Sequence, residues 1–349
     1  GILLSRLSGL VRQRILAHFL GLGDHADAVN AAFRIPNFIQ NLFGEGALSA
    51  SFIPSYARLL GEGRHDDARR LAGAVLALLA EVVGVLVLLG ELLAPWLVTL
   101  LVGNWPDEKR LLTEALVRIL FPGVGIMVLS AWCLGVLNSH RRFLVSYAAP
   151  VAWNLAIIVA VLTAPPTRHD VVVWASWGAV VGAVLQVLVQ LPSVRQVAGT
   201  VRLRSWRSVP EVRTVVRTFL PALVARGAAQ IAAFIDVAIA GFLPRGALAA
   251  ITNAQVLYTL PVSLFGMAIS AAELPEMSRE RGDATAVAGA LRIRLDAATQ
   301  RLAFYIVPSA MAFLAIGGVL AAAVYQTGAF GTDDADYVWL ILCGSAVGL

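Results

Sequence analysis

Charged residues, lysine and cysteine are all scarce in this chain. Only 14% of its 349 residues are charged, whereas an ordinary soluble protein has about 25%. Lys109 is the only lysine, so nearly all of the 27 basic residues are arginines. The two cysteines, Cys133 and Cys343, lie inside apolar runs and form neither a CxxC motif nor a Cys/His cluster. This pattern does not support a disulfide framework or a structural zinc site, and it favours small buried side chains at both positions.

Long polar stretches are also missing, since 58% of the residues are hydrophobic and the charges gather in short segments between apolar runs. Runs of about 20 apolar residues match a hydrocarbon core about 30 Å thick. A membrane β-barrel would instead show alternation over strands of about ten residues. The sequence therefore predicts an all-α polytopic membrane protein. The net charge of +5 fits the basic bias of membrane-protein loops, and we do not expect nucleic-acid binding.

Hydropathy predicts ten helices. They span Ile2–Leu20, Ala28–Tyr56, Leu71–Leu101, Leu111–Leu137, Tyr147–Thr163, Val171–Leu191, Val212–Leu243, Ala247–Ala272, Leu295–Tyr325 and Tyr337 to the end. No cleavable signal peptide is visible, the first residue is Gly1, and the chain stops inside an apolar run at Leu349. We therefore expect a fragment that lacks a few N-terminal residues and an unknown C-terminal part.

The basic residues divide unequally between the two sides of these helices. Seventeen of them fall in the loops on the side of the N-terminus and four, Lys109, Arg110, Arg168 and Arg245, in the loops on the other side. Loops rich in Lys and Arg stay in the cytoplasm. We therefore predict a multi-pass protein of the bacterial inner membrane with its N-terminus in the cytoplasm. For the basic segment from Pro192 to Pro210, two interpretations remain open: contact with the inner leaflet, or a solvated connector.

An internal repeat relates the second helix to the eighth. The first copy is Leu42-Phe43-Gly44, Ser49-Ala50, Pro54 and Arg58, and the second is Leu264-Phe265-Gly266, Ser270-Ala271, Pro275 and Arg279. The copies are offset by six helices, an even number, so both copies point the same way across the membrane. We predict two six-helix lobes, residues 1–205 and a truncated lobe 206–349, which bind substrate between them and alternate access.

Charges inside the first two helices indicate the function. Ser5, Arg6 and Arg12 lie in the first helix, and the second helix carries Arg34, Asn41 and Glu45 on one stripe, with Asp27 at its outer end. Charges within a membrane span are costly and mark functional sites. Arginine binds phosphate through a fork of donors. We therefore predict a water-filled cationic cavity for an anionic headgroup, with a structural Arg34–Glu45 pair as the open alternative.

Later helices add further candidates. Arg226 and Gln230 lie one turn apart in the seventh helix, Asp236 is an ion- or proton-coupling candidate, and Gln255 lies in the eighth. Asp236 is equally consistent with neutralisation by Arg226 or with a position near the outer surface. Glu114 and Arg118 are spaced i, i+4 and predict a structural pair. The chain has no GxSxG, HExxH or P-loop motif, so we expect no catalytic residue, metal or cofactor.

Several runs together resemble one known family. They are Ser5-Arg6-Leu7-Ser8-Gly9-Leu10-Val11-Arg12, Gly21-Leu22-Gly23 with Asp27-Ala28, Ala32-Phe33-Arg34-Ile35-Pro36-Asn37, Leu42-Phe43-Gly44-Glu45-Gly46-Ala47-Leu48-Ser49 and Phe52-Ile53-Pro54. In these runs the chain resembles the MurJ (MviN) lipid II flippase family. The resemblance implies the fold of the multidrug/oligosaccharidyl-lipid/polysaccharide (MOP) exporters, with fourteen helices, of which ten are present here.

The resemblance also implies a substrate, an undecaprenyl-pyrophosphate-linked disaccharide-pentapeptide flipped outward for peptidoglycan synthesis. The cavity residues of the family map onto Arg6, Arg12, Arg34 and Glu45. The chain departs from the family at two places, because Asn41 and Ala254-Gln255 stand where better-known members carry cavity cations. Our hypothesis is that Arg226 compensates for this loss.

The leading prediction is therefore a lipid II flippase that works by alternating access. A drug or polysaccharide exporter of the same superfamily remains an alternative, and so does a non-transporting scaffold that recruits cell-wall enzymes. The expected partners are the lipid-linked substrate, membrane lipids and, as candidates, proteins of cell-wall synthesis.

Overall fold

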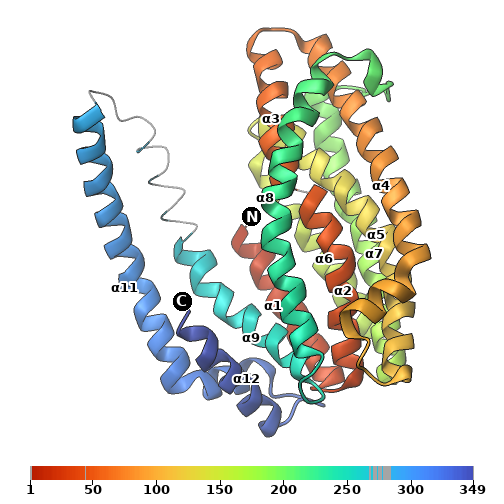
Figure 1. Cartoon of the computed structure of the whole chain (residues 1–349), viewed down its shortest axis with the longest axis vertical. Coiled ribbons are helices and arrows are strands. Elements are labelled where there is room, and N and C mark those ends of the chain that lie inside the picture. Colours follow the sequence, from red (N-terminus) through yellow and green to blue (C-terminus); the bar gives the residue numbers. More distant parts are fainter. Residues whose placement is uncertain are drawn as a thin grey trace. The chain divides into compact units, whose positions relative to one another are not determined.

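The chain is all-helical in a computed structural model (Figure 1). The structure describes residues 2–43, 45–266, 269, 273, 277 and 284–348. The side chains of Glu45 and Arg226 lie outside this description, as do Ser270, Ala271, Pro275 and Arg279 of the predicted second repeat copy.

Two compact units make up the chain. The first consists of Gly1–Leu16 and Gly23–Leu248, and the second of Ala17–Leu22 and Ala249–Leu349. The first unit contains most of α1 (Ile2–Leu20) together with α2 (Asp24–Phe43), α3 (Glu45–Gly61), α4 (His65–Val102), α5 (Asp107–Ser139), α6 (Phe143–Thr163), α7 (Arg168–Ala198), the 3-10 turn η1 (Trp206–Ser208) and α8 (Glu211–Ala240). The second contains most of α9 (Ala247–Pro261), the π-helix η2 (Val262–Gly266), α11 (Ala284–Tyr325) and α12 (Thr332–Ala346). The predicted lobe boundary between residues 205 and 206 stays a prediction, since these units follow contacts and not the repeat.

Six helical segments in the described part of the chain are long and apolar enough to cross a membrane. They are α4, α5, α6, α7, the continuous stretch Ala247–Gly266, and Val287–Tyr325 within α11. The prediction of an all-α polytopic membrane fold is confirmed.

Most helices extend beyond the apolar runs from which they were predicted. The first helix has its predicted bounds, Ile2–Leu20, but α4 begins at His65, six residues before its apolar run. Asp66 and Asp67 lie in its first turn, where negative charge is favourable next to the helix dipole. The predicted second helix appears as α2 and α3, with Gly44 between them outside the described residues.

The predicted loop between Pro192 and Pro210 is shorter in the structure. Helix α7 continues through Pro192 to Ala198, and the connector that follows packs against α4. The indole Nε1 of Trp206 donates to Oε2 of Glu81 at 3.1 Å. A Cβ at Gly73 would lie 2.1 Å from the carbonyl oxygen of Arg202, so only glycine allows this close approach. The structure thus gives the connector a packing surface on α4.

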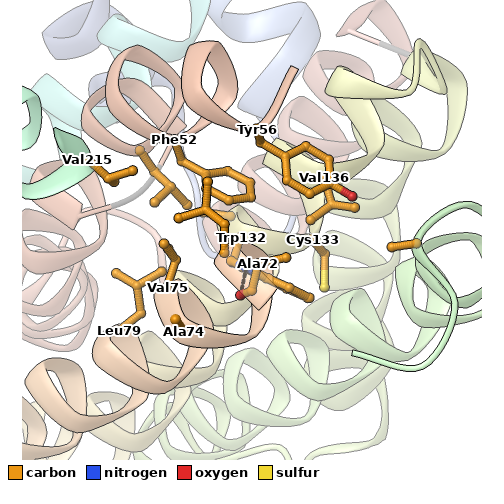
Figure 2. Packing of buried hydrophobic residues seen from close by; sticks show 14 of the residues in the cluster. Phe52, Tyr56, Ala72, Ala74, Val75, Leu79, Trp132, Cys133, Val136 and Val215 are labelled. Atoms are coloured by element: carbon orange, nitrogen blue, oxygen red, sulfur yellow. Dashed lines mark hydrogen bonds between the residues drawn. The ribbon is translucent and has the colours of Figure 1, made fainter. Parts of the chain in front are cut away.

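Trp132 of α5 lies within the buried apolar cluster that holds the first unit together (Figure 2). Its indole Nε1 donates to the carbonyl oxygen of Ala72 in α4 at 3.1 Å. The rings of Phe52 and Tyr56 in α3 stack with centroids 5.1 Å apart, and Val215 of α8 joins the cluster. Val194 and Ala198 of α7 also belong to the cluster, so five helices, α3, α4, α5, α7 and α8, share one core among the described residues.

In the second unit, aromatic residues join the helices. Tyr325 at the end of α11 is fully buried, and its hydroxyl donates to the carbonyl oxygen of Asn253 in α9 at 3.1 Å. The indole of Trp339 in α12 donates to the carbonyl oxygen of Phe313 in α11 at 3.2 Å. These bonds anchor α9 and α12 to α11.

Candidate functional site: an arginine-bearing seam

Arg12 of α1 is held against α6 by an amide. Its Nη1 donates to Oδ1 of Asn154 at 3.1 Å. The same amide donates through Nδ2 to Oγ of Ser8 at 2.9 Å and to the carbonyl oxygen of Ser5 at 3.4 Å. Asn154 is only 4% exposed. The buried amide of Asn154 thus joins the guanidinium of Arg12 to Ser5 and Ser8 of the same helix.

An indole supports the same guanidinium. Cζ of Arg12 lies 4.9 Å from the ring centroid of Trp153, within the range of a cation–π contact. Trp153 in turn donates from Nε1 to the carbonyl oxygen of Ala179 in α7 at 3.0 Å. Nε of Arg12 is buried and has no hydrogen-bond partner among the described residues. A buried donor without a partner costs about 1–3 kcal/mol.

A ladder of three side-chain pairs joins α2 to α8. Nδ2 of Asn41 donates to Oε1 of Gln230 at 3.1 Å, and the rings of Phe38 and Phe234 meet edge to face at 4.9 Å. The third pair, Arg34 and Asp236, interacts electrostatically. As residue numbers rise on α2 they fall on α8, so the helices run antiparallel. We call these three pairs the α2–α8 seam.

The seam gives Asp236 an electrostatic partner other than Arg226, whose side chain lies outside the described residues. Asp236 is exposed and Arg34 is partly buried, and these two groups are electrostatic partners. The positions of Arg34, Phe38 and Asn41 are four and three residues apart, which places them on one face of α2. An arginine on α2 and an acid on α8 therefore influence each other electrostatically within the first unit.

Asp27, a predicted substrate-binding residue, lies in a buried ion cluster. It is 2% exposed, and its Oδ2 lies 2.7 Å from Nζ of Lys109 and accepts from the backbone N–H of Gly246 at 2.8 Å. Lys109 also approaches Oδ1 of Asp24 at 3.2 Å. Arg245 pairs with the other oxygen of Asp24 at 2.9 Å. This ion cluster ties α2, α5 and the turn between α8 and α9 together.

The remaining candidates are distributed as follows. Arg6 is exposed on α1, and Ser5 contributes its carbonyl oxygen to the Asn154 contacts. Glu45 begins α3 and Arg226 lies in α8, but their side chains are not described. Gln255 lies partly buried on α9 in the second unit. The predicted Glu114–Arg118 pair is confirmed, with Oε1 and Nη2 2.9 Å apart.

Sequence reasoning did not assign Trp153, Asn154 and Lys109 to the site. Trp153 and Asn154 lie in an apolar run of α6 without a charge, so their pairing with Arg12 depends on how α1 packs. One feature of the sequence could have drawn attention to Lys109, which is the only lysine in the chain. A buried cation needs a partner, and Asp27 is the acid that meets it.

In chemical terms, the first unit presents cations and amides and no paired catalytic carboxylates among its described residues. Arg12 of α1 is oriented by Asn154, and Arg34 of α2 has Asp236 as an electrostatic partner. Guanidinium groups can bind phosphate oxygens bidentately. No group of three or more metal-ligating side chains occurs in the described residues.

Comparison with known proteins gives the family. The family model described as lipid II flippase MurJ matches residues 16–349. The chain is 32% identical to the lipid II flippase MurJ of Burkholderia cenocepacia over 99% of this chain and 68% of that protein. It is also 32% identical to the probable lipid II flippase MurJ of Rhizobium tropici, over 99% of this chain and 65% of that protein. The chain thus spans about two thirds of the length of these relatives.

Solved structures show the same fold. A lipid II flippase MurJ in an inward closed conformation matches with a TM-score of 0.84 and 22% identity, over 100% of this chain and 73% of that one. A multidrug-resistance transporter of the MATE family in the MOP superfamily matches with a TM-score of 0.73 and 17% identity, over 97% of this chain and 76% of that one. The chain therefore belongs to the lipid II flippase MurJ family, within the MOP exporter fold.

Proposed function

We propose that this chain translocates lipid II, the undecaprenyl-pyrophosphate-linked precursor of peptidoglycan, across the inner membrane. One observation carries the proposal: in a chain of this family, Arg12 is held against α6 by Asn154, and Arg34 on α2 interacts electrostatically with Asp236 of α8. A pyrophosphate that leaves water needs such donors, because a buried anion without a partner is strongly disfavoured.

The site residues take separate roles in this proposal. Arg12 and Arg34 bind the pyrophosphate, assisted by the exposed Arg6, which precedes Arg12 on α1. Asn41 and Gln230 lie on the seam and supply neutral donors and acceptors for the sugar hydroxyls. Asp236 neutralises Arg34 when no anion is bound, and an arriving pyrophosphate competes with this carboxylate. Asp27 has a structural role in its ion cluster.

The chain is a multi-pass inner-membrane protein by its apolar helices and its family. The loop charges support a cytoplasmic N-terminus. The internal repeat supports two lobes and alternating access, with Glu45, Arg226 and Gln255 as further residues of the cavity.

Replacement of the two arginines tests the proposal. The Arg12→Ala/Arg34→Ala double variant should fail to support growth of cells depleted of their own lipid II flippase. Arg118→Ala serves as the matched control, because Arg118 is an exposed arginine paired with Glu114 on α5. Its growth should equal that of the wild type. Full growth of the double variant would overturn the assignment of these arginines.

A further inference from the structure

Trp153 of α6 lies at a junction of helices beside Arg12. Its side chain lines a small cavity of about 10 Å³, which has room for about one water molecule. The other residues that line this cavity come from α2, α5 and α7, among them Phe33, Leu120 and Val180. The indole is therefore enclosed by several helices of the first unit and has little room to move.

The backbone of α7 fixes the indole. Nε1 of Trp153 donates to the carbonyl oxygen of Ala179 at 3.0 Å. A Cβ at Gly182, three residues further along α7, would lie 2.9 Å from Cδ1 and 2.9 Å from the carbonyl oxygen of Trp153. These distances are too short for a Cβ, so α6 approaches α7 this closely only because residue 182 is a glycine. One helix thus holds both the N–H and the edge of the ring.

The same ring contacts the two helices that carry the arginines of the site. Cζ of Arg12 in α1 lies 4.9 Å from the ring centroid. The ring of Phe33 in α2 meets the indole edge to face, with the centroids 6.2 Å apart. Phe33 directly precedes Arg34 in the sequence. Trp153 therefore links the guanidinium of Arg12 to the helical turn of α2 that carries Arg34.

Trp153 and Asn154 restrict Arg12 in different ways. Oδ1 of Asn154 accepts a hydrogen bond from Nη1 and so occupies one of the five N–H donors of the guanidinium. Trp153 attracts the cation through the π-system of its ring. A phosphate binds to the N–H donors, so it competes with an acceptor such as Asn154 and not with the ring. The indole can therefore orient Arg12 while a phosphate is bound.

We propose that Trp153 is a positioning residue of the anionic-headgroup site, which orients the guanidinium of Arg12 and holds it at a fixed place relative to the turn of α2 that carries Arg34. This inference rests on the proposed function and deepens it. Arg12 contacts the pyrophosphate, and Trp153 acts on binding through Arg12.

A double-mutant cycle of lipid II binding tests the inference. Fluorescent lipid II is titrated into the whole purified protein in lipid nanodiscs, and the dissociation constants are compared. We expect Trp153→Leu to weaken binding about tenfold or more when Arg12 is present. In an Arg12→Gln background it should weaken binding less than about twofold, because the indole then has no cation to position. A purely structural role would weaken binding equally in both backgrounds, and that result would overturn the inference.

Two further variants separate the aromatic ring from its packing. Trp153→Phe keeps an aromatic face and loses the bond to Ala179, and its affinity should stay within about threefold of that of the wild type. Trp177→Leu is the matched control, because Trp177 is a tryptophan of α7 that is 55% exposed. Its affinity should equal that of the wild type. A loss in Trp153→Phe as large as that in Trp153→Leu would show that the aromatic face does not hold Arg12.

Gly182→Ala keeps the test decisive if Trp153→Leu does not fold. Its methyl group displaces the indole without removing it. It should weaken binding about fivefold or more when Arg12 is present and less than about twofold in the Arg12→Gln background. Thermal unfolding of each variant shows which of them fold, and equal losses in the two backgrounds would again overturn the inference.

The wild type and Arg12→Gln separate this inference from the proposed function. If Arg12→Gln weakens binding and the effect of Trp153→Leu is equal in both backgrounds, the positioning role fails and the proposed function stands. If the wild type binds no lipid II, the proposed function fails, and the unfolding temperatures of the same four proteins without ligand decide the contact. Shifts that are smaller together than their sum support the Trp153–Arg12 contact, and additive shifts contradict it.

Discussion

At the scale of single residues, Arg12 and Asn154 behave as one binding group. Asn154 accepts from Arg12 and donates to α1 at two points. Loss of a hydrogen bond to a charged group costs about 1.5–3 kcal/mol. We expect Asn154→Leu to weaken lipid II binding by about tenfold or more. The effect should be far from additive with Arg12→Gln in a double-mutant cycle, measured by binding to the purified protein.

The matched control for that cycle is Gln190→Leu. Gln190 is a fully buried amide on α7 that accepts a hydrogen bond from Oγ of Ser130 in α5 at 2.8 Å. It should lower stability and leave lipid II affinity unchanged. Additive effects of Asn154→Leu and Arg12→Gln would contradict a positioning role for the amide.

Lys109 provides a residue-scale test of the buried ion cluster. Lys109→Met leaves Asp27 buried without its cation, and breaking a buried pair in this way costs about 3–5 kcal/mol. The measurement is equilibrium unfolding in mixed micelles. Arg110→Ala, which removes an exposed pair with Asp107, should cost less than about 1 kcal/mol. Adding Asp27→Leu to Lys109→Met should recover much of the loss, and no recovery would contradict the pairing.

At the scale of the helices, alanine substitutions at two glycines of α4 should change the stability of the protein in opposite directions. A Cβ at Gly90 would lie 2.1 Å from the ring of Phe121, whereas nothing lies within 4 Å of one at Gly84. Gly90→Ala should destabilise the protein by about 1–3 kcal/mol through overpacking. Gly84→Ala should stabilise it by up to about 1 kcal/mol, because glycine is a poor helix former. Equal unfolding free energies for the two variants would show that α5 does not close against α4 at Gly90.

The apolar runs predicted where most helices begin and end. They did not predict which helices contact one another. The spans of α1 and of α6 to α8 follow from hydropathy to within several residues at most ends, because a membrane span must satisfy its own backbone. The extra turn of α4 before Leu71 depends on polar residues that lie beyond the apolar run. The seam depends on the register between α2 and α8, which periodicity within one helix does not contain. Arg34 and Asp236 were therefore each predicted as site residues, but the electrostatic interaction between them was not.

At the scale of the whole molecule, the loop charges predict which side each turn faces. In a variant without Cys133 and Cys343, a cysteine in place of Glu62 should be protected from a membrane-impermeant maleimide in intact cells. A cysteine in place of Asp107, at the exposed start of α5, should react. The difference follows from the excess of arginine on the side of Glu62. The reverse labelling pattern would invert the predicted orientation.

Direct translocation of fluorescent lipid II in proteoliposomes tests the central claim, which is that oriented arginines of the first unit hold a pyrophosphate during transport. The wild type and Arg118→Gln should move the labelled lipid at equal rates. Arg34→Gln should lower the rate at least tenfold, because an amide cannot replace a charged donor fork. Wild-type translocation by Arg34→Gln, or none by the wild type itself, would contradict the account.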